Sequence, residues 1–267
     1  MPIRITDQIG RSLELQCPPK RVISCVPSQT ELLFDLGMEE FIEGITKFCV
    51  HPQSALKTKT IVGGTKNLNL DRIVALNPDF ILANKEENDK ASIEFLSERF
   101  PTYVSDVRTL EQAITMIKDV GAICGKENQA NGLISNIKSR FSTIENHDKT
   151  FTAAYLIWQN PWMTVSEDTF IHDMLSRCGF ENVFGCRSDS RYPIVTDEQI
   201  RQANPEIIFL SSEPYPFKTT HITTLKRQFP NSHLAIVDGE MFSWYGSRLQ
   251  HFNTRIKTDV MSSTNHP

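Results

Sequence analysis

The side chains best suited to hold a metal ion are Cys49 and His51, with His172 further along the chain. Thiolate and imidazole are ligands that zinc, copper and iron favour in proteins. Alternate residues of an extended segment face opposite ways, so Cys49 and His51 are poorly arranged to share one ion. The competing interpretations are a buried thiol, a histidine bonded to backbone and, for His172, a place on a helix surface. The metal question stays open, with Cys49 and His51 as its candidates, and His51 is also a candidate ligand contact.

Sequence motifs of the common enzyme classes are absent. The chain has no G-x-S-x-G, no G-x-x-x-x-G-K-[ST] and no G-x-G-x-x-G, which are the signatures of an esterase nucleophile, a phosphate loop and a dinucleotide site. We therefore expect no catalytic residues and no enzyme activity. A metal-dependent enzyme built on Cys49 and His51 is the alternative.

Aromatic residues gather where a hydrophobic core least requires them. Trp158, Trp162 and Trp244 are the three tryptophans of the chain, and each falls in a predicted loop after a strand. Such rings suit a flat, aromatic-lined cleft. Trp162 and Trp244, with the neighbouring Tyr245, are predicted to contact a ligand, whereas Trp158 could instead extend its strand into the core.

Cationic residues in the same predicted loops could meet an anionic ligand group. Arg191, followed by Tyr192, and Arg248 can each offer a planar fork to a carboxylate or phosphate. Lys66 could do the same as a point charge. The alternatives are a solvated loop for Lys66 and, for Arg248, a role in capping or pinning its loop.

One supersecondary unit occurs twice and would place these loops. Residues 69–82 and 196–209 share a pattern 127 residues apart. Each copy opens with a helix N-cap, Asn69 or Thr196, and Thr196 forms a predicted capping box with Gln199. Each then predicts a short helix that stops before Pro78 or Pro205, followed by an apolar run typical of a strand buried on both faces. Two copies indicate two lobes.

Strands alternate with helices along the rest of the chain, which predicts an α/β fold with mostly parallel, Rossmann-like sheets. A pattern of apolar residues from Ala130 to Ile144 predicts one amphipathic helix of roughly 20 residues that joins the lobes. The predicted domains are 1–125, a connecting helix at 126–147, and 148–267. The other predicted helices are 32–36, opened by a capping box at 28–31, 109–123 and about 168–178. The predicted strands are 22–26, 44–48, 80–83, 151–157, 207–210 and 234–237.

Composition narrows the partners and the compartment. The chain has 267 residues, of which 39% are hydrophobic, and a net charge of −4, so it can form large cores and lacks the basic field that nucleic acid requires. Six cysteines without metal-type spacing favour reduced thiols. No leader pattern and no membrane-spanning apolar run is present. As written, the chain is expected to be cytoplasmic, or periplasmic or lipid-anchored if a leader has been removed.

A set of short motifs occurs in a characteristic order along most of the chain. These stretches are Arg21-Val-Ile-Ser, Pro27-Ser-x-Thr-Glu31, Gly44-Ile-Thr, His51-Pro52, Val62-Gly-Gly64, Asn69 to Asp79, Asn160-Pro161 and Trp244-x-Gly-x-Arg248. Together they resemble the substrate-binding proteins of ABC importers for vitamin B12, ferric siderophores or haem, closest to the cobalamin-binding type. This resemblance implies the class III periplasmic-binding-protein fold, in which one rigid helix joins two lobes and the ligand lies between them.

The resemblance also implies roles for single residues. Phe48 falls where B12 binders place an aromatic ring against the corrin, and an aromatic ring stacks well on a flat macrocycle. Thr65 replaces a second such aromatic, which departs from the cobalamin pattern. In the family one surface glutamate per lobe docks on the permease, and the candidates are Glu86, Glu87 and Glu213.

We therefore expect noncatalytic binding of a corrinoid, haem or iron chelate between two lobes, without a resident cofactor. The ligands considered are cobalamin or cobinamide, haem and ferric siderophores. The chain is expected to be a monomer that does not span a membrane, and to serve an ABC permease or to be a cytosolic relative of such proteins. Besides the metal-dependent enzyme, the alternative is an interaction module with an empty cleft.

Overall fold

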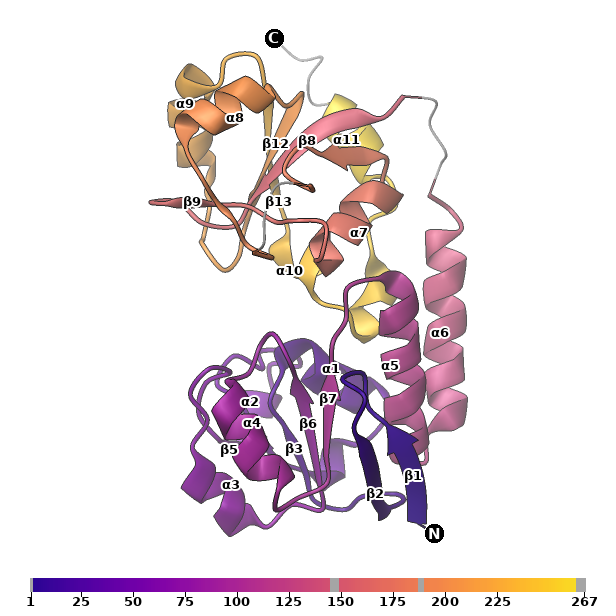
Figure 1. The fold of residues 1–267 in the computed structure, drawn as a ribbon. Coiled ribbons are helices and arrows are strands. Elements are labelled where there is room, and N and C mark those ends of the chain that lie inside the picture. Colours follow the sequence, from indigo (N-terminus) through magenta and orange to yellow (C-terminus); the bar gives the residue numbers. More distant parts are fainter. Residues whose placement is uncertain (1, 145–148, 187–189, 263–267) are drawn as a thin grey trace. The chain divides into compact units, whose positions relative to one another are not determined.

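The computed structural model describes residues 2–144, 149–186 and 190–262 (Figure 1). The chain divides into two compact units, and neither is one continuous stretch. The sequence-based boundaries assign residues 244–250 to the second domain. In the structure these residues belong to the first unit, although the stretches on both sides of them belong to the second. The first unit comprises Met1–Val107, Glu111–Lys138 and Trp244–Gln250, and the second comprises Arg108–Leu110, Ser139–Ser243 and His251–Pro267.

The first unit is built on a five-stranded parallel sheet in the order β5-β4-β3-β6-β7. All five residues of β6 are buried, as its unbroken apolar run predicts. A separate antiparallel hairpin, β1 with β2, precedes the sheet. The strands are β1 Pro2–Thr6, β2 Ser12–Gln16, β3 Val22–Ser24, β4 Ile42–Ile45, β5 Thr60–Ile61, β6 Phe80–Asn84 and β7 Thr102–Ser105.

Helices connect these strands and cover the sheet, and both long helices, α5 and α6, follow β7 (Figure 1). Ile23, Val62, Ile73 and Ile81 lie at the centre of one core cluster between sheet and helices, and all are fully buried. The helices are α1 Pro27–Asp35, η1 Glu39–Phe41, α2 Ala55–Thr58, α3 Leu70–Leu76, α4 Lys90–Ser97, α5 Leu110–Ile123 and α6 Glu127–Phe141.

The second unit contains a four-stranded parallel sheet in the order β10-β8-β12-β13 and a short antiparallel pair, β9 with β11. The strands are β8 Phe151–Leu156, β9 Trp162–Met163, β10 Phe180–Asn182, β11 Ile194–Val195, β12 Ile207–Ser211 and β13 His233–Val237. The helices are α7 Phe170–Arg177, α8 Asp197–Ala203, α9 Thr219–Gln228, α10 Gly239–Ser243, η2 Ser247–His251 and α11 Ile256–Ser262.

The predicted repeat is confirmed as α3-β6 in one unit and α8-β12 in the other. The Asn69 side chain accepts a hydrogen bond from Arg72 N at the start of α3, and Thr196 with Gln199 completes a capping box on α8. Both helices end on an asparagine in the left-handed conformation, with φ 45° at Asn77 and φ 41° at Asn204. Asparagine tolerates this conformation better than most residues, so each helix turns sharply into its buried strand.

Three local predictions were wrong. The capping box expected at Ser28 does not form, because Pro27 opens α1 and Ser28 lies inside the helix. The strand expected at 44–48 ends at Ile45, since Lys47 N already bonds Gly63 O and Cys49 N turns back onto Thr46 O. The connecting helix stops at Phe141 after 15 residues, and beyond it the Ser142 and Thr143 hydroxyls bond nearby carbonyls, which competes with the helix.

Candidate functional site

Each unit presents a set of loops at the carboxyl ends of its parallel strands, where open α/β sheets hold ligands. In the first unit the loop after β4 carries Phe48, whose side chain is 50% exposed. Lys47 Nζ lies 5.1 Å from the Phe48 ring centroid. Gly64 makes room for the ring, since a Cβ there would lie 3.3 Å from Phe48 Cε2. The Phe48 ring therefore packs next to Gly64 and remains half exposed.

His51 lies three residues further on and packs on Trp244. The two ring centroids are 5.3 Å apart and the rings are nearly perpendicular, at 76°. Trp244 is buried and His51 is half-buried. The structure thus brings together two residues that the sequence separates by most of its length, with the imidazole as the more accessible partner.

Arg248 also contacts Trp244, with its guanidinium carbon 4.8 Å from the ring centroid. It donates two hydrogen bonds to Glu31, from Nε at 2.9 Å and from Nη2 at 2.8 Å. Burial raises the pKa of Glu31, and the Arg248 charge opposes that rise. Of the two roles considered for Arg248, pinning its loop is the one that this geometry favours.

Cys49 faces inward and does not join His51 in a ligand set. Its sulfur contacts the hydroxyls of Thr30 and Thr46 at 3.0 and 3.2 Å, and burial raises the pKa of the thiol. His172 is half-buried in α7, where burial lowers its pKa. Among residues 2–144, 149–186 and 190–262, no group of three histidine, cysteine or acidic side chains is arranged to hold a metal ion.

The remaining predicted residues of the first unit surround the loop after β6. Lys66 is exposed and donates from Nζ to the carbonyl of Glu86. Tyr245 is only 7% exposed, and burial raises the pKa of its hydroxyl well above the ordinary value, with Glu87 and Glu86 adding to the rise. Thr65, the departure from the cobalamin pattern, is buried. Tyr245 thus packs within the unit, whereas Glu87 is exposed and Glu86 half-exposed.

The second unit presents Trp158 after β8. Trp158 is 38% exposed and meets Tyr215 edge to face at 5.5 Å. Tyr215 follows β12, the neighbour of β8 in the sheet, and its hydroxyl donates to Gln159 Oε1 at 3.2 Å. Sequence reasoning missed Tyr215, although its place four residues beyond the second repeat strand was a usable signal.

Trp162 lies in β9 rather than in a loop, and this prediction was wrong. It is 8% exposed and donates its indole N–H to Asp197 Oδ1 at 2.6 Å. Its ring also lies parallel to Phe217, at 11° and 6.3 Å. The tryptophan that the sequence favoured is therefore a core residue, and Trp158 is the one whose ring is accessible.

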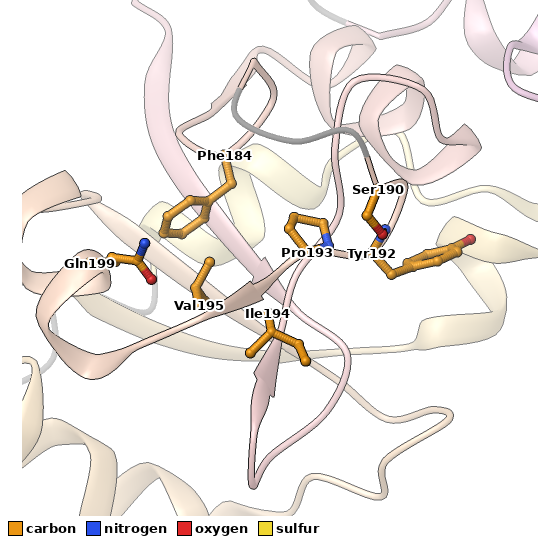
Figure 2. A pocket seen from close by; sticks show the side chains of 7 residues that line it. All are labelled: Phe184, Ser190, Tyr192, Pro193, Ile194, Val195 and Gln199. Atoms are coloured by element: carbon orange, nitrogen blue, oxygen red, sulfur yellow. The ribbon is translucent and has the colours of Figure 1, made fainter.

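Arg191 and Tyr192 are neighbours in sequence, but their side chains have different partners. Arg191 Nε pairs with Asp168 Oδ2 at 3.0 Å, and Arg108 pairs with the other oxygen of Asp168 at 2.7 Å. Tyr192 lines a pocket of about 420 Å³, with Phe184 and Gln199 at the opposite end (Figure 2). The pocket is lined by Phe184, Ser190, Tyr192, Pro193, Ile194, Val195 and Gln199.

Glu213, the third docking candidate, bonds within its own unit. It follows β12 and is half-buried, and its Oε1 accepts a hydrogen bond from Ser243 Oγ at 2.9 Å. Its Cγ also fills the space where a side chain at position 239 would begin, which only glycine leaves open. Its carboxylate is therefore engaged within the second unit.

Comparison with known proteins gives one consistent family. Residues 22–234 match the model described as periplasmic binding protein. A vitamin B12-binding protein of Photorhabdus laumondii is 30% identical over 222 residues, which are 78% of this chain and 80% of that one. An uncharacterised ABC transporter substrate-binding lipoprotein of Bacillus subtilis is 26% identical, over 78% of this chain and 68% of its own length.

Solved structures show the same fold. The periplasmic vitamin B12-binding protein BtuF of Vibrio cholerae superposes with a TM-score of 0.77 at 19% identity, over 94% of this chain and all of that one. The two parallel α/β units therefore have the architecture expected from the sequence. In the described part of the chain, the helices are all too short or too polar to cross a bilayer.

Proposed function

Because the chain belongs to the periplasmic binding protein family, we propose that it binds a corrinoid, a haem or an iron chelate as the substrate-binding component of an ABC importer. Members of this family are binding proteins and not enzymes, and the site described above needs no catalytic group for that task. Binding alone requires shape, apolar area and a few fixed polar contacts.

The observation that carries this proposal is an accessible aromatic side chain at the carboxyl ends of the strands in each unit. Phe48 is 50% exposed in the first unit and Trp158 is 38% exposed in the second. Each ring contacts a neighbouring side chain, Phe48 that of Lys47 and Trp158 that of Tyr215. Rigid aromatic rings bind a flat macrocycle with little loss of conformational entropy.

The relatives' names support a partner and a place of action. One relative is called an ABC transporter substrate-binding lipoprotein and one solved neighbour a periplasmic protein. We infer action outside the inner membrane, either free or lipid-anchored, with delivery to a permease. For docking on that permease, Glu86 and Glu87 are the candidates in the first unit, and Glu213, whose carboxylate bonds Ser243, is the candidate in the second.

A titration tests the ligand class. Purified protein is titrated with cobalamin, cobinamide, haemin and a ferric tris-catecholate while the visible spectrum is followed, and thermal melting is measured with each ligand in excess. Ligand at about 100 times its Kd should stabilise the fold by about 2.7 kcal/mol. A spectral shift with a raised melting temperature for one compound supports the proposal and names the ligand.

A variant pair ties the binding to the site. Phe48→Ala should raise the Kd of that ligand roughly tenfold, because it removes an accessible ring near the centre of the contact. Ile9→Ala is the control, since Ile9 is also an exposed apolar residue, 39% accessible, but lies between β1 and β2. If no compound changes the spectrum or the melting temperature, the chelate proposal is wrong and an interaction module gains support.

A further inference from the structure

The segment Trp244–Gln250 is a late piece of chain that belongs to the first unit, while residues on both sides of it belong to the second. Its packing is tight: Gly246 lies directly against the carbonyl of Ser28 in α1, where any Cβ would collide. A glycine is therefore required at this position. The segment must be held in place by more than chain connectivity, since both of its neighbours lie in the other unit.

Not every polar atom buried at this contact is hydrogen-bonded. The Oγ of Ser247 and the Oε1 of Gln29, both fully buried, find no hydrogen-bond partner among the described residues. Buried polar atoms without partners cost stability. Arg248 and Glu31, by contrast, form a hydrogen-bonded ion pair between the segment and α1.

This pair has the geometry of a strong attachment. Both nitrogens of one edge of the Arg248 fork reach the two oxygens of Glu31, at 2.9 and 2.8 Å. The side chains are 22% and 17% exposed, so water screens the pair only in part. Paired, charge-assisted hydrogen bonds of this kind fix orientation as well as distance.

Two aromatic rings continue the contacts of this pair. The guanidinium carbon of Arg248 lies 4.8 Å from the ring centroid of Trp244. Trp244 in turn contacts His51 edge to face. Glu31, Arg248, Trp244 and His51 thus form one chain of contacts from α1 to the half-exposed imidazole, in the same loop as Phe48.

We propose that Glu31 is a positioning residue for the ligand site: by holding Arg248 it fixes Trp244 against His51 and keeps the guanidinium away from the ligand. The consequence for the ligand depends on the proposed function, whereas the positioning of Trp244 does not. Arg248 then acts through Trp244 and does not bind an anionic group of the ligand itself.

The first test needs no ligand. The protein is labelled with 5-fluorotryptophan, and Trp244→Phe assigns one of the three fluorine resonances. Glu31→Gln keeps the size of the side chain but loses its charge, and should shift or broaden the Trp244 resonance while those of Trp158 and Trp162 stay in place. An unchanged Trp244 resonance overturns the proposal.

A matched control separates positioning from general loss of stability. Arg177 and Asp173 form a pair of similar burial in α7, at 2.8 Å with side chains 29% and 19% exposed. Because Asp173 also accepts a bond from Leu110 N at 2.8 Å, Asp173→Asn should lower the melting temperature at least as much as Glu31→Gln but leave the Trp244 resonance where it is. A shift of that resonance in both variants would indicate a general structural effect and overturn the proposal.

The second test uses the ligand that binds the wild-type protein. Glu31→Gln and Arg248→Lys should each raise its Kd roughly tenfold, because lost preorganisation must be recovered on binding, and the double variant should be no weaker than either single one. If Arg248 instead binds the ligand, Arg248→Lys alone weakens binding, and Glu31→Gln leaves it unchanged or tighter, which overturns the proposal. If no compound binds, the proposed function fails, and the Trp244 resonance still decides the role of Glu31.

Discussion

The indole N–H of Trp162 donates to Asp197 Oδ1 at 2.6 Å and so joins β9 to the first turn of α8. Asp197 also accepts a bond from Gln228 at 2.7 Å, which extends the link to α9. The Trp162 ring therefore stabilises the packing of the second unit. An aromatic residue after a strand is not by itself evidence of a ligand cleft.

Replacing Trp162 by phenylalanine should destabilise the protein and leave ligand binding almost unchanged. Loss of the bond to Asp197 and of part of the ring should lower the free energy of unfolding by about 1–3 kcal/mol. Urea denaturation measures this, with Trp158→Phe as the control. A variant as stable as the wild type would show that the Asp197 bond contributes nothing.

Trp158→Ala should have the opposite profile. Its ring is 38% exposed, so the free energy of unfolding should change by less than about 1 kcal/mol. The Kd of the ligand identified by titration should rise about tenfold or more, since truncating an accessible aromatic ring removes a large contact area. Isothermal titration of the wild type and of the variant measures the two Kd values. Equal values would show that the ligand does not contact Trp158.

The left-handed asparagines predict a third pair of results. At Asn204, where φ is 41°, alanine should lower the free energy of unfolding by roughly 1–2 kcal/mol, because its Cβ disfavours this conformation. Glycine at the same position should be nearly neutral. Asn77→Ala and Asn77→Gly repeat the comparison in the first unit, and equal stability of the two variants at either site would contradict the explanation.

Glu206 should make the free energy of unfolding depend on pH in the acidic range. Hydrogen bonds from Lys149 and from Thr152 N hold the pKa of the Glu206 carboxyl below its ordinary value of 4.5. A carboxyl with a depressed folded-state pKa stabilises the protein above its unfolded-state pKa, and that contribution is lost as the pH falls through the folded-state value.

Glu206→Gln should therefore flatten the fall in stability below pH 4.5. Urea denaturation at a series of pH values between about 6 and 3 measures the slope. Glu198→Gln is the control, since Glu198 pairs with Arg201 three residues away on the exposed face of α8. If both variants keep the wild-type slope, the acid dependence has another source.

Local signals in the sequence were enough for the repeat. The caps at Asn69 and Thr196, and the prolines that follow each helix, act within a few residues, so short stretches determine the outcome. The capping box expected at Ser28 does not form, for an equally local reason. Pro27 is preorganised for the first position of a helix, so α1 starts at Pro27, before Ser28.

The site was harder to predict because its contacts are distant in sequence. The partner of Arg248 is Glu31, 217 positions away, and the partner of Trp162 is Asp197, 35 positions away. Nothing near Trp158 or Trp162 distinguishes an accessible ring from a buried one, because that depends on which strand folds back to cover it. The predicted roles of Lys66 and Tyr192 in ligand contact stay predictions.

The return of residues 244–250 to the first unit affects how the protein can be made and taken apart. During synthesis the stretch that Glu31 must bind leaves the ribosome only after nearly all of the second unit, so the first unit cannot be completed while the chain is short. A gene fragment ending at residue 138 would likewise encode a first unit that lacks its last piece. Expressing the first unit on its own would therefore require a chain in which residues 244–250 are joined back to it.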